Sequence, residues 1–230
     1  MGSFYANIHL HTAERARVLH AWQGYWAGRE EPAWAWVSPV YGGWVSVFDW
    51  RTDQPDTDIL RELAAHLNHE VAAVALAFQV QNSALAEYWL YNAGHEVDHY
   101  TSNSDYFAAD AEWPSTTPAE GVFSGFGPDS RAGYATEEDL SDGGNTGLLR
   151  SLANVAVSEV ELEAILRTPA YIADDILTAL ASALGIHDSW AALGYHYLTS
   201  DDDTIPGRDA FVHLPEGEPP NAQRFPEERE

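Results

Sequence analysis

The stretch His95–His99, with the sequence HEVDH, places two imidazoles and two carboxylates within five residues. Imidazole and carboxylate groups bind transition metals and exchange protons, so a metal centre or an acid–base site is the first interpretation. On a helix, the two histidines would be neighbours at i and i+4 and would be able to share one ion. The chemistry of this stretch therefore depends on its secondary structure.

The residues before this stretch favour a strand. Asn92-Ala93-Gly94 has the composition of a three-residue hairpin loop with glycine at the left-handed position. Such a loop makes residues 95–101 a strand antiparallel to residues 85–91. At a rise of about 3.3 Å per residue, His95 and His99 then stand roughly 13 Å apart, which is too far to chelate one ion.

Glu96 and Asp98 are the carboxylates that remain, since alternation puts them on one face of the strand, roughly 6.6 Å apart. Two interpretations stay open for them, a divalent-metal or acid–base site and a solvated sheet edge. His66 and His69 have metal-ligand spacing on a helix but no obvious third ligand. The acidic run 200–204 lacks the glycine and the distal glutamate of an EF-hand loop. We therefore expect no cofactor.

Two absent residue types exclude whole classes of chemistry. The chain has no Cys, and all 11 of its basic residues are Arg, so Lys is absent as well. The first absence excludes thiol nucleophiles and disulfides, and the second excludes the P-loop lysine and Schiff-base chemistry. The segment GFGPDS lacks the third glycine of a dinucleotide fingerprint, and VFSGFG lacks a glycine of the nucleophile elbow. The sequence favours a protein that is not an enzyme.

The net charge of −25 opposes binding to nucleic acid or to an anionic membrane, because both require a cationic surface. Solubility in a salt-rich cytoplasm is one interpretation of this charge. The others are a mimic of nucleic acid and a partner for a basic protein. No run of about 18 apolar residues predicts a membrane span. The start MGSFYANIHL lacks the basic and apolar regions of a signal peptide, so we expect a cytoplasmic protein.

Hydrophobic periodicity divides the first hundred residues into strands and helices. Strands are predicted at 4–10, 33–38, 43–50, 72–80 and 84–91, and helices at 12–26 and 56–70. The order β-α-β-β-α-β is that of the split β-α-β, ferredoxin-like arrangement, which the hairpin strand at 95–101 would extend. The predicted class is α+β with a mixed or mainly antiparallel sheet.

Alternation along the predicted strands separates small aliphatic side chains from aromatic ones. The aliphatic face would lie under the two helices and consists of Phe4, Ala6, Ile8, Ala33, Ala35, Val37, Val45 and Val47. The opposite face collects Tyr5, His9, Trp34, Trp36, Trp44, Phe48 and Trp50. An apolar face of this size is too large to remain in contact with water without a reason. We expect the second half of the chain to cover it. The alternative is a peptide or small-molecule groove, for which Trp34, Trp36, Trp44 and Trp50 are the candidate binding residues.

The rest of the chain divides by composition. After a sheet domain at 1–107, residues 108–147 are rich in Pro, Gly, Ser, Thr and acids and predict a long loop region. Residues 148–215 predict a helical part that packs on the second face of the sheet, and residues 216–230 a flexible acidic tail.

Helix signals are clear within 148–215. Ser158 and Glu161 have the spacing of a capping box, Thr168-Pro169 predicts the start of the next helix, and Gly185 predicts its end. The apolar stripe between them consists of Ile172, Ile176, Leu180 and Leu184. Such a stripe is typical of a helix that packs on the core. Residues 193–199 and 210–214 are candidates for late strands.

Two segments resemble an uncharacterised family of bacterial proteins. That family opens with a Ser-Phe-Tyr-Ala-Asn strand, matched here by Ser3–Asn7, and later shows a Leu-Tyr…Gly…Val-Asp-x-Tyr-x-Ser…Tyr-Phe pattern. The matching positions are Leu90, Tyr91, Gly94, Val97, Asp98, Tyr100, Ser102, Tyr106 and Phe107. Ser104-Asp105 stands where the family often has a proline before the last Tyr.

The resemblance implies no activity. It supports treating Asp98, Tyr100 and Tyr106 as one unit, because a carboxylate that holds a Tyr hydroxyl is an effective anchor for a loop. The same three residues are candidates for a binding site.

The sequence thus favours a non-enzymatic cytoplasmic protein that acts through protein–protein contact, such as an immunity-type or regulatory partner. Its acidity, its incomplete motifs and its surplus of aromatic residues motivate this expectation. One alternative is a metal-assisted hydrolase or ligand-binding enzyme that uses Glu96 and Asp98, and another is an acidic mimic of nucleic acid. The expected partner is a protein, a basic one in particular, and neither nucleic acid nor membrane is expected to bind directly.

Overall fold

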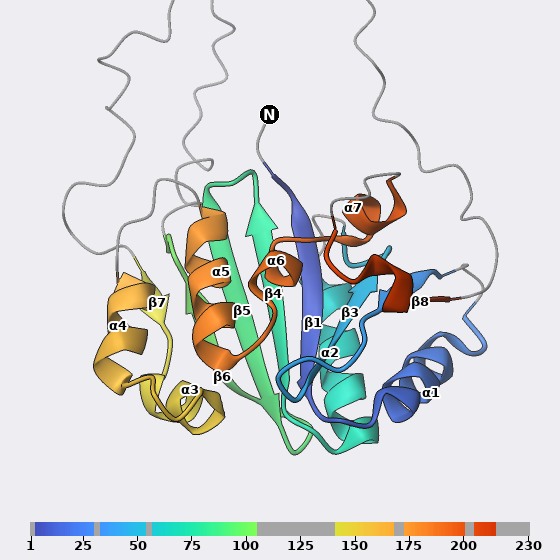
Figure 1. The fold of residues 1–230 in the computed structure, drawn as a ribbon, viewed down its shortest axis with the longest axis horizontal. Helices are drawn as coiled ribbons and strands as arrows, with labels where there is room; N and C mark the ends of the chain where they lie inside the picture. The colour runs from blue at the N-terminus through green and yellow to red at the C-terminus, as the bar shows by residue number, and fades with distance from the viewer. Residues whose placement is uncertain are drawn as a thin grey trace, which may run out of the picture.

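One antiparallel sheet of eight strands organises the described part of the chain in this computed structural model (Figure 1). The structure describes residues 3–29, 33–53, 57–104, 141–167, 173–200 and 205–214. The strands are β1 (Tyr5–His11), β2 (Ala35–Val37), β3 (Trp44–Asp49), β4 (Ala75–Gln81), β5 (Leu85–Asn92), β6 (His95–Thr101), β7 (Asp142–Gly143) and β8 (Val212–Leu214). Their order across the sheet is β7-β6-β5-β4-β1-β3-β2-β8, and all neighbours run antiparallel.

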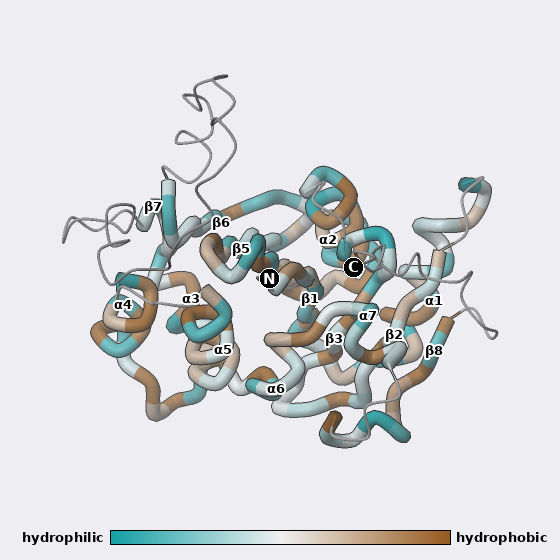
Figure 2. Tube along the Cα trace, turned by 90° about the horizontal axis from the view of Figure 1, so that it is seen from above, coloured by the Kyte–Doolittle hydropathy of each residue, from teal (hydrophilic) through white to brown (hydrophobic). Residues whose placement is uncertain are grey.

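Helices lie on both faces of this sheet. Those in the described residues are α1 (Arg15–Trp26), α2 (Thr57–Val71), α3 (Thr146–Leu152), α4 (Glu159–Arg167), α5 (Ala173–Leu184), α6 (Asp188–Ala191) and α7 (Tyr195–Thr199), with a short 3-10 helix, η2 (Arg208–Ala210), before β8. Figure 2 places α2 on one side of the strands and α5 and α6 on the other. The expectation of a mixed helix-and-sheet fold with mainly antiparallel pairing is confirmed.

The first face of the sheet packs against α1 and α2. On α2, Leu60, Leu63 and Leu67 recur at helical spacing and are fully buried. Helix α1 contributes Val18 and Trp22. The sheet supplies the small and β-branched side chains Ala6, Ile8, Ala35, Val37, Val45, Val47, Ala75 and Ala77. Alternation predicted the residues of β1, β2 and β3 among these beneath two helices, and β4 adds Ala75 and Ala77.

The second face packs against the C-terminal helices. Ile176, Leu180 and Leu184 of α5 are buried in a core that also contains side chains of β1, β3, β4, β5 and β6. Helix α5 ends as predicted at Gly185, whose φ of 78° is left-handed. The amide of Ile186 reaches the carbonyl of Ala181 at 2.9 Å, which closes a Schellman motif.

The predicted capping box at the start of α4 is also present. The Ser158 amide and hydroxyl both donate to Oε2 of Glu161, at 2.7 and 2.8 Å. The Glu161 amide donates back to the Ser158 hydroxyl at 3.2 Å. The predicted helix start at residues 168–169 and the first member of the apolar stripe, residue 172, lie outside the described residues.

One late strand was predicted wrongly. Residues 193–199 alternate like a strand, yet they form the short helix α7, in which Tyr195 and Leu198, three residues apart, are both buried. The alternation was misleading because the two buried side chains, Tyr195 and Leu198, have the spacing of one helix face. Gly194 precedes the first turn of this helix. The other prediction, 210–214, contains β8, an edge strand of the sheet, which pairs with β2 through Trp36 and His213.

Of the predicted loop region 108–147, only 141–147 falls within the described residues, and it contains β7 and the first residues of α3. The predicted tail at 216–230 lies outside them. None of the described helices is long and apolar enough to span a lipid bilayer.

Candidate functional site

A β-bulge separates the two carboxylates that the sequence placed on one face. The hairpin loop has two residues, Ala93 and Gly94, with φ values of 50° and 82°, where a three-residue loop was predicted. Pairing runs regularly from the loop to Tyr91, opposite Glu96, and then resumes with Leu90 opposite Asp98. The residue between the two carboxylates, Val97, is the extra one.

Paired residues share a face, so the bulge reverses the alternation of β6. Glu96 follows Tyr91 onto the face of α1 and α2, whereas Asp98 follows Leu90 onto the face of α5. The prediction that these carboxylates form a same-face pair is therefore wrong. They cannot hold one ion between them, because the sheet lies between them.

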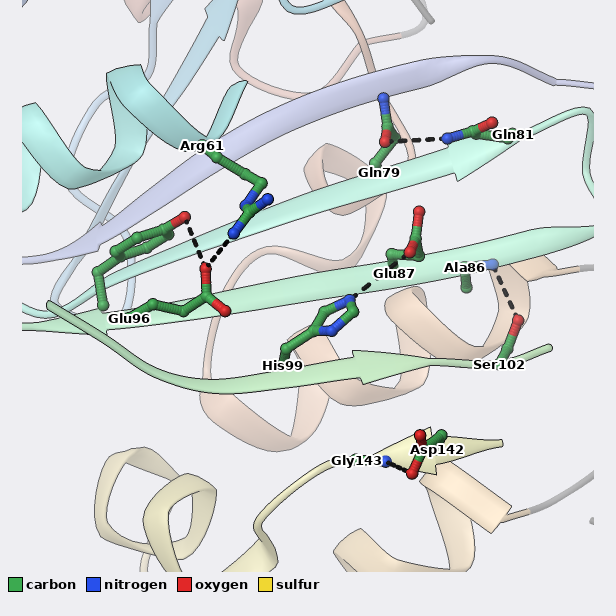
Figure 3. A network of polar contacts seen from close by, with 11 residues as sticks. Arg61, Gln79, Gln81, Ala86, Glu87, Glu96, His99, Ser102, Asp142 and Gly143 are labelled. Carbon is green, nitrogen blue, oxygen red and sulfur yellow. Dashed lines mark hydrogen bonds and ion pairs between the residues drawn. The ribbon is translucent and has the colours of Figure 1, made fainter. Parts of the chain in front are cut away.

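Glu96 takes part in a contact between strand and helix. Its Oε2 atom lies 2.9 Å from Nη2 of Arg61 on α2 and 3.4 Å from the Tyr91 hydroxyl (Figure 3). The Arg61 and Glu96 side chains are 44% and 34% exposed, so solvent screens their attraction. The pair joins α2 to β6, and both of these contacts use the Oε2 atom of Glu96.

Asp98 has a structural role on the other face. Its Oδ2 atom accepts hydrogen bonds from the Tyr88 hydroxyl and from the Asn145 amide, both at 2.7 Å. The second bond ties β6 to the residue that caps α3. Asp98 therefore attaches β6 to the start of α3.

Tyr100 lies beside this anchor and is fully buried. Its ring stacks on Tyr88 with centroids 5.5 Å apart, and its hydroxyl donates to the carbonyl of Leu166 at 2.8 Å. The sequence predicted Asp98, Tyr100 and Tyr106 as one unit. In the structure Asp98 holds the hydroxyl of Tyr88, whereas the hydroxyl of Tyr100 bonds to a backbone carbonyl. Tyr106 lies outside the described residues.

The predicted aromatic face is covered in the structure. Trp44 is 1% exposed and its Nε1 donates to the carbonyl of Leu184, the last residue of α5, at 3.0 Å. Trp36 donates from Nε1 to the Thr199 hydroxyl of α7 at 3.2 Å. The expectation that the second half of the chain covers this face is confirmed for these two tryptophans.

The other two candidate tryptophans contact each other. The rings of Trp34 and Trp50 meet edge to face, with centroids 5.6 Å apart. Trp34 is 7% exposed and Trp50 is half-buried. The four tryptophans Trp34, Trp36, Trp44 and Trp50 therefore do not form one open platform.

A serine–histidine pair lies beneath these aromatic residues. Nδ1 of His9 is 2.8 Å from the Ser46 hydroxyl, which is the contact that activates a nucleophile in many hydrolases. Both residues are buried, and burial lowers the pKa of His9 to about 3. The imidazole is therefore a poor base, and no substrate reaches the serine. The pair therefore has a structural role within the core.

Two buried carboxylates were missed by the sequence analysis. Asp49 accepts hydrogen bonds from the indoles of Trp22 and Trp26 at 2.6 and 2.9 Å. Asp53 accepts from the amides of Ala6 and His196 at 3.0 and 3.2 Å, so it joins β1 to the start of α7. Asp49 is the last residue of β3 and Asp53 follows in the polar segment after it, and neither spacing nor composition distinguishes them from solvated residues.

Burial raises the pKa of Asp49 to about 6 and that of Asp53 to about 7. The hydrogen bonds to each carboxylate act in the opposite direction but are outweighed by the loss of solvent. Perturbed carboxyl groups are typical of active sites and also of structural networks. Here every hydrogen-bond donor comes from the fold itself, which favours a structural role.

A second polar group on the α2 side was also missed. Gln79 and Gln81 of β4 bond to each other, and Glu87 of β5 lies beside His99 of β6 (Figure 3). Glu87 is 8% exposed, and its Oε1 atom lies 3.6 Å from Nε2 of His99. The His99 ring stacks on Trp89 at 5.1 Å. The contact between Glu87 and His99 could not be predicted without the register of β5 against β6, which the bulge alters.

The remaining histidine candidates are separate from one another. His66 contacts the carbonyl of Ala21 at 3.1 Å, whereas the His69 side chain is 75% exposed. His95 pairs with Asn92 beside the hairpin loop. Across the described ranges, no three His, Asp or Glu side chains converge as metal ligands would.

Comparison of the chain with protein-family models, with curated proteins and with solved structures gave no match. The function is therefore inferred from the charge of the chain and from the geometry of its described residues.

Proposed function

We propose that this protein is non-enzymatic and acts by binding another protein, one that carries a positively charged surface. The observation that carries the proposal is the charge of the chain, which is −25 overall and is unbalanced in the helical part as well. Residues 141–200 hold seven acidic residues and two Arg. A surface of this kind attracts cationic partners and repels polyanions.

The absence of an assembled reaction centre among the described residues supports the same proposal. The carboxylates of Glu96 and Asp98 lie on opposite faces, and the serine of the His9–Ser46 pair is 1% exposed. The aromatic candidates Trp36 and Trp44 are engaged by the C-terminal helices. Cytoplasmic location and membership in the family that the motifs resemble remain predictions.

For the fold we propose that residues 5–81 form a split β-α-β unit of the ferredoxin-like kind, with β5 and β6 as an added hairpin. The supporting observation is the local strand order β4-β1-β3-β2, in which β1 lies between β4 and β3. Helices α1 and α2 connect the strands that are separated in this order.

An affinity experiment tests the functional proposal. Untagged protein is coupled to a resin and exposed to a lysate at about 0.05 M and at about 0.3 M NaCl, between which the Debye length falls from roughly 14 Å to roughly 6 Å. We expect one dominant partner with a basic surface, whose retention falls as salt rises. Retention of no partner, or of an acidic partner that is insensitive to salt, would contradict the proposal.

The same experiment separates the nucleic-acid mimic from the general proposal. A mimic would occupy the DNA- or RNA-binding surface of its partner, so added duplex DNA would displace it from that partner. Displacement by DNA at constant ionic strength therefore favours the mimic. Retention in the presence of DNA favours an ordinary acidic partner.

A divalent-cation site is a second candidate function, and it rests on Glu87 and His99. At metal–ligand bonds of about 2.1 Å, two tetrahedral ligand atoms lie roughly 3.4 Å apart. The measured separation of Oε1 and Nε2 is 3.6 Å. Imidazole with carboxylate is a donor set that suits zinc and manganese.

The matched histidine on the same strand provides the control for this candidate. Zinc and manganese are titrated into untagged protein by calorimetry, and His99→Ala is compared with His95→Ala. A stoichiometric ion that is lost in His99→Ala and in Glu87→Gln, and kept in His95→Ala, would support a metal-dependent protein. Equal binding by all variants would eliminate the site.

A further inference from the structure

The two most exposed apolar side chains of the described residues lie where α3 connects to α4. Among the described residues, Val155 is 87% exposed and Val160 is 78% exposed, the two highest exposures of any large hydrophobic residue. Helices α3 and α4 lie at one end of the sheet, beside β7 (Figures 1 and 2). We define the α3–α4 surface by Val155, Glu159, Val160 and Glu163.

The valines of the α3–α4 surface do not serve the core. Leu162 and Leu166 are the buried residues of α4, and Val160 precedes Leu162 by two positions, which places it on the opposite side of the helix. A β-branched residue on the outer face also lowers helix propensity relative to a charged residue. The exposure of Val160 therefore needs a reason other than folding.

The turn that carries Val155 is held at several points. The carbonyl of Val155 accepts from Nη2 of Arg150 at 3.2 Å, and the amide of Asn154 donates to the carbonyl of Ala183 on α5 at 3.2 Å. The amide of Val157 closes the turn on Asn154 at 3.0 Å. An apolar side chain on a turn that is already ordered binds a partner with little further loss of entropy.

The acidic residues of this surface differ in the contacts that they make. Glu159 and Glu163 are four residues apart on α4, and like charges at that spacing repel each other. Arg167 contacts Glu163 at 3.0 Å, whereas Glu161 is committed to the capping box. Because Arg167 already pairs with Glu163, Glu159 is the carboxylate beside Val160 that a cationic group from outside would balance.

Two further segments of the chain are acidic as well. Residues 105–140 carry eight acidic residues and one Arg, and residues 215–230 carry five acidic residues and two Arg. A second copy of the chain would bring another net charge of −25. Charge complementarity therefore points to a different protein.

We infer that the α3–α4 surface docks a segment of a partner protein in which basic residues flank an apolar side chain. The apolar side chain contacts Val155 and Val160, and the basic residues contact Glu159 and Glu163. This inference rests on the proposed function and names the part of the molecule that performs it. It requires that the two valines contribute affinity beyond the general charge of the protein.

Two labelled peptides and two variants test the inference. One peptide alternates Arg and Leu, and its matched control replaces each Leu by Ser. Binding to the full chain is followed by fluorescence anisotropy for Val155→Ser/Val160→Ser and for Val97→Ser. Val97 is 42% exposed on β6, so its substitution controls for the loss of an exposed valine elsewhere. Circular dichroism establishes that both variants are folded.

We expect the Arg–Leu peptide to bind more tightly than the Arg–Ser peptide. We expect the double variant to lose roughly tenfold in affinity for it, with Val97→Ser unchanged. If both peptides bind equally and the double variant behaves like Val97→Ser, the α3–α4 surface is not the docking site. The proposed attraction to basic partners would still hold. If neither peptide binds, the surface and the proposed function both fail.

Discussion

The carboxylates of Glu96 and Asp98 lie on opposite faces of the sheet, although only Val97 separates them along β6. Each has a structural partner on its own side, Arg61 of α2 for Glu96 and Tyr88 for Asp98. One inserted residue thus turns an apparent acidic pair into two separate attachments of the hairpin. The stretch His95–His99 therefore stabilises the position of β6 between two layers of helices.

Substitution of these two carboxylates is expected to have unequal effects. Asp98→Ala leaves the Tyr88 hydroxyl without its acceptor and releases the Asn145 amide, so we expect a loss of about 1–3 kcal/mol in the free energy of unfolding. Glu96→Ala breaks an ion pair that is largely exposed, for which about 0–1 kcal/mol is expected. Urea unfolding measures both. Equal losses would show that Asp98 does not anchor the chain at α3.

The physical limits of the sequence analysis are clearest at β6. Alternation correctly assigned the small residues Ala6, Val45 and Val47 to the face beneath α1 and α2, because one face of a long strand is buried throughout. Alternation fails at a bulge, since a single inserted residue exchanges the faces and no residue type marks Val97 as that insertion.

A related limit applies to α7 and to the buried polar groups. The alternating pattern of residues 193–199 resembles a strand, and the helix forms there with backbone amides bound by Asp53, a residue more than 140 positions earlier. The indole partners of Asp49 come from α1, and His99, the partner of Glu87, comes from the neighbouring strand, so these environments also depend on contacts between elements. Hydrophobic periodicity therefore predicted the layers of helices and strands. It did not predict the buried carboxylates that lie between those layers.

The stability of the protein is expected to depend on pH through Asp49 and Asp53. Burial raises their pKa values to about 6 and about 7, so the folded protein retains protons that the unfolded chain releases above pH ~4. Retention of a proton by the folded state means that the free energy of unfolding falls as pH rises. The expected slope is about 1.4 kcal/mol per pH unit for each group, from pH ~4 to its folded pKa.

Asp49→Asn isolates one of these contributions, because its amide oxygen still accepts from the Trp22 and Trp26 indoles. Between pH ~4 and about 6 the variant should lose less stability than the wild type as pH rises. Between about 6 and about 7 the two proteins should run parallel, since Asp53 titrates in both. Parallel curves over the whole range would show that Asp49 does not retain its proton.

Two glycines are expected to respond in opposite directions to substitution by alanine. Gly24 lies in α1, and a Cβ atom added there meets nothing within 4 Å, so Gly24→Ala should stabilise the protein by about 0.5–1 kcal/mol. A Cβ atom at Gly194 would lie 2.5 Å from both carboxylate oxygens of Asp53. Gly194→Ala should therefore displace that carboxylate from the start of α7 and cost about 1–3 kcal/mol.

Thermal unfolding of the two glycine variants, at one pH and one ionic strength, is sufficient for the comparison. A lower midpoint for Gly24→Ala would mean that α1 is not a regular helix at this position. An unchanged midpoint for Gly194→Ala would mean that Asp53 does not depend on the close approach of the Gly194 backbone.

The covering of the aromatic face is expected to appear in a comparison of Trp44→Ala with Trp50→Ala. Trp44 is 1% exposed and donates to the last carbonyl of α5, so its truncation removes a packed side chain and leaves the Leu184 carbonyl without that partner. We expect a loss of about 3–5 kcal/mol in the free energy of unfolding for Trp44→Ala. Trp50 is half-buried and packs on Trp34, so a smaller loss is expected.

Urea unfolding followed by far-ultraviolet circular dichroism measures both losses without relying on tryptophan fluorescence. If Trp44→Ala cost no more than Trp50→Ala, α5 would not be a necessary cover, and this face would again become a candidate binding surface.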